Sequence, residues 1–184
     1  MESLRGQLLI AAPQLADPNF RQAVVLRVEH NEDGALGLTL NRPLTTPLHE
    51  LWQDIGGGSC PSEQPVFSGG PVEGPILCLH RQADVAESEV LPGVFFSGER
   101  QHLLDVVRDN RQPFNIYVGY AGWGAGQLEG ELKLGGWLTV PATDDTIFRD
   151  DSTDLWDDVL RHKGRAILRD TLGIRDFPDE PEWN

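Results

Sequence analysis

The chain of 184 residues contains two cysteines, two lysines and one methionine. Cys60 and Cys78 lack the spacing of a zinc ligand set or a redox CxxC motif, so we expect reduced thiols, no metal and no cofactor. No segment approaches the roughly 20 apolar residues that cross a bilayer, and the N-terminus has no secretory signal pattern. These absences predict a cytoplasmic protein without a membrane segment.

Positive charge is also scarce. Fifteen Lys and Arg residues face 29 Asp and Glu residues, which gives a formal net charge of −14. A protein that binds duplex DNA neutralises many phosphates with clustered Lys and Arg, and this chain has no basic run. Direct DNA binding is therefore not expected. An acidic surface suits a basic protein partner instead.

Familiar catalytic signatures are missing. The chain has no phosphate-binding GxxxxGK[ST] loop, no GxSxG nucleophile turn, no HExxH pair and no GxGxxG fingerprint. The aspartates between Asp144 and Asp158 do not follow the spacing of a calcium-binding loop, and acidic residues are common at helix starts. No metal site is predicted.

Periodicity predicts one α+β domain over residues 1–184. The ranges 24–30 and 35–41 alternate apolar and polar residues around a turn that ends Asp-Gly, which indicates an antiparallel hairpin. Further strands are expected at 6–11, 66–68, 76–82, 93–97, 114–120 and 137–140. Helices are expected at 47–55, 98–110 (with Ser97 as its cap), 126–134, 153–162 and 165–172, and a frayed acidic tail at 176–184.

The segment Gly119–Glu129 is the most distinctive part of the chain. It places Gly122, Gly124 and two aromatics, Tyr120 and Trp123, between a strand-like run and a helix-like run. We interpret it as an exposed bend whose aromatics stack on a ligand and whose amides, ahead of a helix, attract an anion. The alternative is that the aromatics pack in the core and the glycines only make room for them.

Other candidate ligand residues stand at strand ends. Arg42 would bind an anion, and Asn41 and Gln127 would hydrogen-bond to polar groups of the ligand. Gly69 and Gly70 would offer backbone N–H groups as an anion-binding nest. The alternatives are that Arg42 pairs with a local carboxylate and that the two glycines only form a tight turn.

A catalytic role has only two candidate residues. His80 is the single plausible acid–base group, and Glu129, or its neighbour Glu131, would be the second acid or base of a hydrolytic enzyme. The alternative is a structural, half-buried His80.

Several blocks of the chain resemble the AlgH/YqgE-like family of bacterial proteins. They fall in order between residues 4 and 172, at 6–11, 34–38, 41–43, 69–72, 119–123 and 126–129. One departure is Ala23, where the family more often has Ser or Thr. The resemblance implies an α+β fold with a largely antiparallel sheet curled into a partial barrel and flanked by helices. It implies no activity, because the family's biochemistry is unassigned, although some members carry a transcriptional-regulator label.

Three functions remain open from the sequence. The favoured one is a regulatory module that binds a small anion or nucleotide. The second is a transcriptional regulator that acts through a protein partner, and the third is a hydrolytic enzyme.

Overall fold

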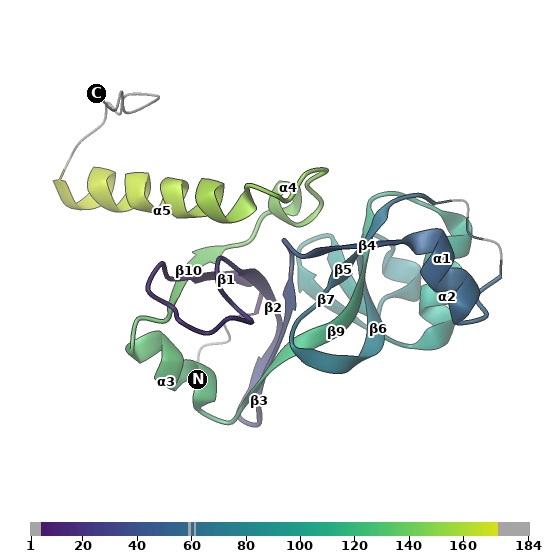
Figure 1. Ribbon diagram of the computed structural model, residues 1–184, viewed down its shortest axis with the longest axis horizontal. Coiled ribbons are helices and arrows are strands. Elements are labelled where there is room, and N and C mark those ends of the chain that lie inside the picture. The colour runs from purple at the N-terminus through teal and green to yellow at the C-terminus, as the bar shows by residue number, and fades with distance from the viewer. Residues whose placement is uncertain (1–4, 59, 61, 173–184) are drawn as a thin grey trace.

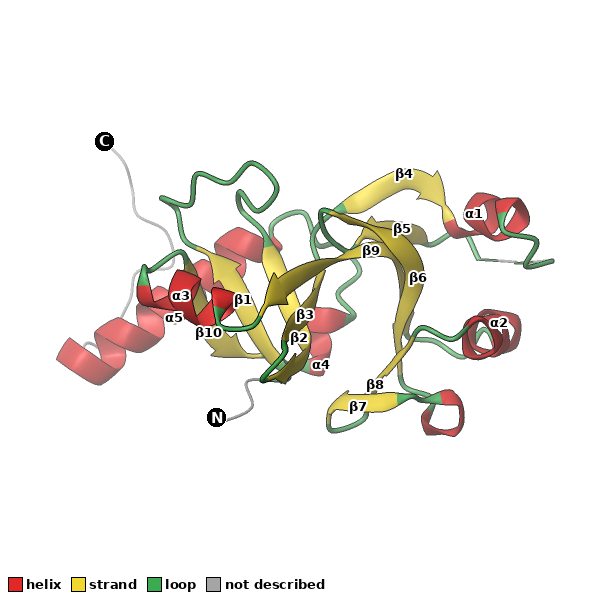
Figure 2. Cartoon of the chain, turned by 90° about the horizontal axis from the view of Figure 1, so that it is seen from below, coloured by secondary structure: helices red, strands yellow, loops and turns green. Residues whose placement is uncertain are grey.

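The computed structural model describes residues 5–58, 60 and 62–172. Its ten strands form one curled sheet in the order β10-β1-β2-β3-β9-β6-β8-β7, with β5 attached to β9 and β4 attached to β5 (Figure 2). The strands are β1 Gln7–Ala11, β2 Val24–Asn31, β3 Gly34–Thr39, β4 Pro43–Pro47, β5 Pro65–Ser68, β6 Val72–His80, β7 Ser88–Leu91, β8 Val94–Ser97, β9 Phe114–Gly124 and β10 Trp137–Pro141. The predicted α+β class and the partial barrel are confirmed.

The predicted hairpin is formed by β2 and β3, with Leu26 opposite Leu38. β1 lies between β2 and β10 and pairs antiparallel with both. Alternation within β2 sends Val24, Leu26 and Val28 into one buried cluster and Val25 into another on the opposite face. The sheet is therefore covered on both faces.

β9 is the central strand, and it extends farther than the sequence predicts. Its first half pairs with β6 and, in parallel, with β5, and its last residues, Ala121–Gly124, pair with β3 (Figure 1). The bend predicted within Gly119–Glu129 therefore comes later than expected: residues 119–124 are strand, and the turn before α3 is at Ala125 and Gly126. Gly119, at φ +73°, lets the strand change direction while the pairing continues on both sides of it.

Five helices cover the described part of the sheet. They are α1 Leu48–Asp54, α2 Arg100–Asp109, α3 Gln127–Lys133, α4 Asp144–Ile147 and α5 Leu155–Leu172, with a short 3-10 turn η1 at Ala83–Val85. Figure 1 shows α1 and α2 at one end, α3 at the other, and α5 lying along β1 and β10.

Several boundaries differ from the prediction. α2 begins after Glu99 rather than with Ser97 as its cap, because the Ser97 hydroxyl is used inside the sheet. The two predicted C-terminal helices are the single helix α5, and β4, β7 and α4 were not predicted. The tail at 176–184 lies outside the described residues.

Candidate functional site

The two consecutive glycines of the predicted anion nest lie at a close crossing of two chain segments. The Gly69 N–H donates to the Val118 carbonyl (2.9 Å), and the Gly69 carbonyl accepts from the Thr39 N–H (2.8 Å). A Cβ at Gly69 would lie 2.1 Å from the Gly119 oxygen, and one at Gly70 would lie 2.3 Å from the Tyr120 backbone. The geometry therefore explains both glycines by close backbone approach.

Asn41 and Arg42 fasten the loop before β2. Asn41 accepts from the Val24 N–H through Oδ1 (2.9 Å) and donates to the Gln22 carbonyl through Nδ2 (2.8 Å). The Arg42 guanidinium donates to the Asn41 and Arg21 carbonyls, and partial burial lowers the Arg42 pKa. Both side chains therefore hydrogen-bond to backbone groups. For Arg42 the sequence suggested a ligand or a local carboxylate as partner, not backbone carbonyls.

Trp123 is buried, so the prediction of an exposed stacking ring is wrong. Only 5% of the residue is accessible, and its ring stacks on Phe20 with the centroids 5.9 Å apart. The Glu131 Oε2 atom accepts hydrogen bonds from the indole N–H groups of Trp123 (3.0 Å) and Trp137 (2.8 Å). Gln127 accepts from the Gly124 N–H (3.1 Å) and donates to Glu131 (3.1 Å). These contacts anchor α3 to the sheet.

Glu129 belongs to a charged cluster on the same side of the sheet. Its Oε1 atom lies 2.7 Å from the His30 Nε2, and this hydrogen bond lowers the Glu129 pKa. Arg27 of β2 is completely buried, and burial lowers its pKa to about 10, partly offset by the charge of Glu129. Alternation along β2 makes Arg27 point away from Val24, Leu26 and Val28, and in the structure α3 and its neighbours cover the face to which it points. Glu129 is thus a partner for His30 and a countercharge for Arg27.

His80 is completely buried on β6. Its Nδ1 atom accepts from the Gln82 N–H (3.1 Å), so the ring proton sits on Nε2, 2.9 Å from the Ser97 hydroxyl. Ser97 in turn donates to the Val85 carbonyl (2.8 Å). Burial lowers the His80 pKa to about 4. A substrate could reach neither ring nitrogen without local unfolding.

The lowered His80 pKa predicts a loss of stability in acid. In the unfolded chain His80 titrates near 6.5, so below this pH the unfolded state binds a proton that the folded state excludes. Stability should fall by about 3 kcal/mol between pH 6.5 and pH 4 from this group alone. Urea unfolding of wild type and His80→Gln at pH 7 and pH 4.5 measures it. The free-energy gap between them should narrow on acidification, and a constant gap would contradict the assignment.

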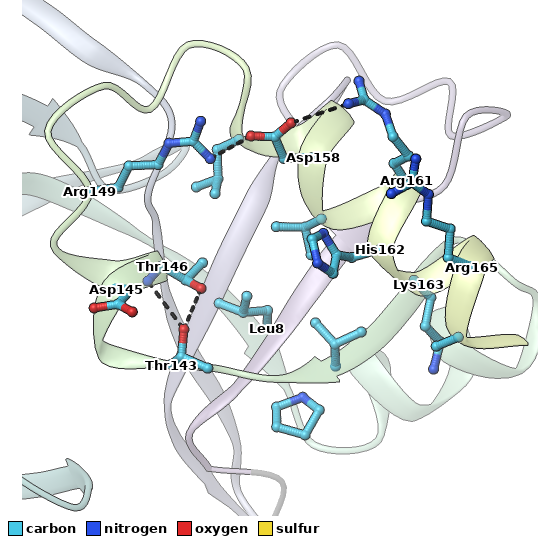
Figure 3. A pocket seen from close by; sticks show the side chains of 15 residues that line it. Leu8, Thr143, Asp145, Thr146, Arg149, Asp158, Arg161, His162, Lys163 and Arg165 are labelled. Carbon is cyan, nitrogen blue, oxygen red and sulfur yellow. Dashed lines mark hydrogen bonds and ion pairs between the residues drawn. The ribbon is translucent and has the colours of Figure 1, made fainter. Parts of the chain in front are cut away.

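A cleft of about 680 Å³ lies beneath α5 (Figure 3). Its floor is apolar and is made by β1, β10 and the inner face of α5: Leu8, Val140, Pro141, Leu155 and Val159. Figure 3 shows the polar side chains of α5 on one side and Thr143, Thr146 and Arg149 on the other. We call it the α5 cleft.

The described lining of the α5 cleft has more cationic than anionic side chains, although the chain is acidic. Four cationic side chains line it, Arg149, Arg161, Lys163 and Arg165, against two carboxylates, Asp145 and Asp158. Asp158 accepts from Arg149 (2.6 Å) and lies 3.7 Å from Arg161. Lys163 is half-buried and forms no ion pair with any described residue.

Sequence reasoning missed the α5 cleft because β1, β10 and α5 bring its lining together from distant parts of the chain. The only sequence signal was the grouping of Arg161, Lys163 and Arg165 in a chain otherwise poor in positive charge.

A second, more open groove contains some of the predicted ligand residues. Tyr120, Gly122 and Trp123 line it, together with two carboxylates, Glu29 and Asp33. The predicted residues are therefore divided: Tyr120, Gly122 and Trp123 meet at this groove, whereas Asn41, Arg42 and His80 do not line it. No helix among the described residues has the length and apolar character needed to span a membrane, and no cluster of metal-ligating side chains occurs in the same part of the chain.

Comparison with known proteins gives a consistent result. A family model described as AlgH-like matches residues 8–168. The chain is 36% identical to a UPF0301 protein of Chlorobaculum tepidum over 165 residues (86% of each protein), and 39% identical to one of Myxococcus xanthus over 168 residues (89% of this chain, 93% of the relative). The solution structure of AlgH from Pseudomonas aeruginosa superposes with a TM-score of 0.72 at 33% identity, covering 96% of both chains. The chain belongs to the AlgH-like family.

Proposed function

We propose that this protein is a regulatory module that binds a small organic anion in the α5 cleft. The observation that carries the proposal is the positive surplus of this cleft in a chain of net charge −14. A cleft lined by one sign of charge concentrates oppositely charged ligands. Lys163 supports it further, because a half-buried ammonium without a carboxylate partner among the described residues is stabilised by a bound anion.

The lining also narrows the ligand class. A volume of about 680 Å³ falls in the range of small-molecule sites. The floor residues Leu8, Val140 and Val159 are aliphatic, and the lining residues that the structure describes include no Phe, Tyr or Trp to stack on a base. An organic acid or a phosphate ester with an aliphatic body therefore suits the cleft better than a nucleotide.

The setting that we propose is the cytoplasm. Cys60 and Cys78 are both free thiols, which suits a reducing compartment. The arginine and lysine side chains of the cleft are suited to holding and orienting an anion, so we favour a binding role over a hydrolytic one.

A thermal-shift experiment tests this proposal. Wild type is screened against inorganic phosphate, citrate, glucose 6-phosphate, octanoate and AMP. A ligand at 100 times its Kd adds about 2.7 kcal/mol, which raises the Tm by about 5–10 °C in a protein of this size. We expect octanoate or a phosphate ester to give the largest shift.

The matched pair of variants is Lys163→Ala and Lys133→Ala, because these are the only two lysines of the chain. Lys133 is exposed at the end of α3 and does not line the α5 cleft. We expect Lys163→Ala to weaken binding about tenfold and Lys133→Ala to leave it unchanged. No shift with any compound, or equal losses in both variants, would overturn the proposal.

A further inference from the structure

The groove that Tyr120 and Gly122 line lies where the β2–β3 hairpin meets the end of β9. Its volume is about 450 Å³ and it is broadly open. We call it the hairpin groove. It does not share residues with the α5 cleft, so its role is independent of the function proposed above.

One edge of β9 is open along this groove. β3 pairs with Ala121–Gly124 on one side, whereas on the other side the pairing of β6 ends where Val72 meets Tyr120. Among residues 5–58, 60 and 62–172, no strand therefore pairs with Gly122–Gly124 on the side away from β3. Gly122 and Gly124 are exposed, and the Gly124 N–H is occupied by Gln127. An unpaired edge is a template for an added strand.

The walls of the hairpin groove define the chemistry of an added strand. Val72 is 37% exposed and, with half-buried Leu36 and Tyr120, supplies an apolar surface. Exposed carboxylates of Glu29 and Asp33 supply negative charge, and the groove's described lining contains no lysine or arginine. These residues lie on one face of the sheet, because Glu29 pairs with Leu36, Leu36 with Gly122 and Val72 with Tyr120. Every second side chain of an added strand points to this face, so a segment with basic residues at alternate positions presents all of them to the acidic wall.

We infer that the hairpin groove binds an extended, basic segment of a partner protein, which adds a short strand to the edge of β9 at Gly122–Gly124. Main-chain hydrogen bonds to the open edge supply affinity, and the apolar and acidic walls supply specificity. A role through a protein partner was one of the functions left open by the sequence, and this inference assigns a surface to it.

The probe for this inference is a fluorescein-labelled six-residue peptide that alternates lysine and valine. Fluorescence anisotropy measures its Kd for the full chain, and amide chemical shifts locate the binding. We expect saturable binding, with the largest shifts at Gly122, Gly124 and Leu36. The double variant Glu29→Lys/Asp33→Lys should weaken binding at least tenfold.

Two controls separate this result from simple charge attraction. Glu50→Lys/Asp54→Lys makes the same change in net charge on exposed positions of α1, at the other end of the molecule (Figure 1), and should weaken binding less than threefold. A peptide with proline in place of valine keeps the charge but loses every second backbone N–H and the valine side chains, and should bind at least tenfold more weakly.

Three outcomes of the peptide experiment would overturn the inference. They are equal losses in the two double variants, equal binding of the proline peptide, and no saturable binding of the lysine–valine peptide. Sedimentation of the free protein tests a second copy as occupant. A concentration-dependent dimer that shifts the Gly122 amide would assign the edge to self-association and reject a partner segment.

Discussion

Replacing Gly69 by alanine should destabilise the protein by at least about 3 kcal/mol, which lowers the Tm by about 6–12 °C. The added methyl group would lie 2.1 Å from the Gly119 carbonyl oxygen and 3.1 Å from a methyl group of Leu38. The nearest obstacle is backbone within β9, which is held by strands on both sides, so it cannot move aside as a flexible side chain would. Thermal and urea unfolding measure the loss.

Gly74→Ala is the matched control. Gly74 lies in the neighbouring strand β6, is exposed, and has no atom within 4 Å of an added Cβ, so its substitution should change stability by less than about 0.5 kcal/mol. The pair also separates two explanations of the glycines at 69 and 70. An anion nest would leave Gly69→Ala as stable as Gly74→Ala and impair only anion binding. Equal stability of Gly69→Ala and Gly74→Ala would therefore contradict the close backbone approach at Gly69.

Pairing between strands that follow one another in the sequence was predictable. The β2–β3 hairpin follows from alternation and an Asp-Gly turn within 18 residues, and both signals are local. The course of β9 through Gly124 was not predictable in this way. There the β9 backbone closely approaches Gly34, Gly69 and Gly70, which are distant from it along the chain.

The same distinction applies to the candidate site residues. Alternation correctly separated Arg27 from the apolar residues of β2, but only the position of α3 turns that face into an interior. His80 ends a strand, as expected, yet β8 and the turn after it enclose the ring completely. The α5 cleft requires the packing of α5 on β1 and β10, which no local pattern encodes. The sequence thus showed where polar residues lie along the strands, but it did not show whether those residues are exposed to solvent.

Replacing Glu131 by alanine should cost about 3 kcal/mol of stability. Its Oε2 atom is the acceptor for the indole N–H groups of Trp123 and Trp137, which are only 5% and 3% exposed. A buried donor left without a partner costs about 1–3 kcal/mol, and here two lose their acceptor together. Alanine is the best helix former, so helix propensity in α3 does not account for the loss. Urea unfolding followed by tryptophan fluorescence measures it.

Glu131→Gln distinguishes the hydrogen bonds from the side chain's packing and charge. The glutamine carbonyl oxygen keeps an acceptor at the two indoles, so this variant should lose less than half as much stability as Glu131→Ala. The charge itself contributes through stronger, charge-assisted hydrogen bonds, and this part is lost in both variants. A Glu131→Ala loss below about 1 kcal/mol would mean that water replaces the carboxylate at both indoles. The expected order, wild type above glutamine above alanine, instead makes Glu131 the residue that fixes α3 onto the sheet, and α3 in turn covers Arg27 and positions Glu129 beside His30.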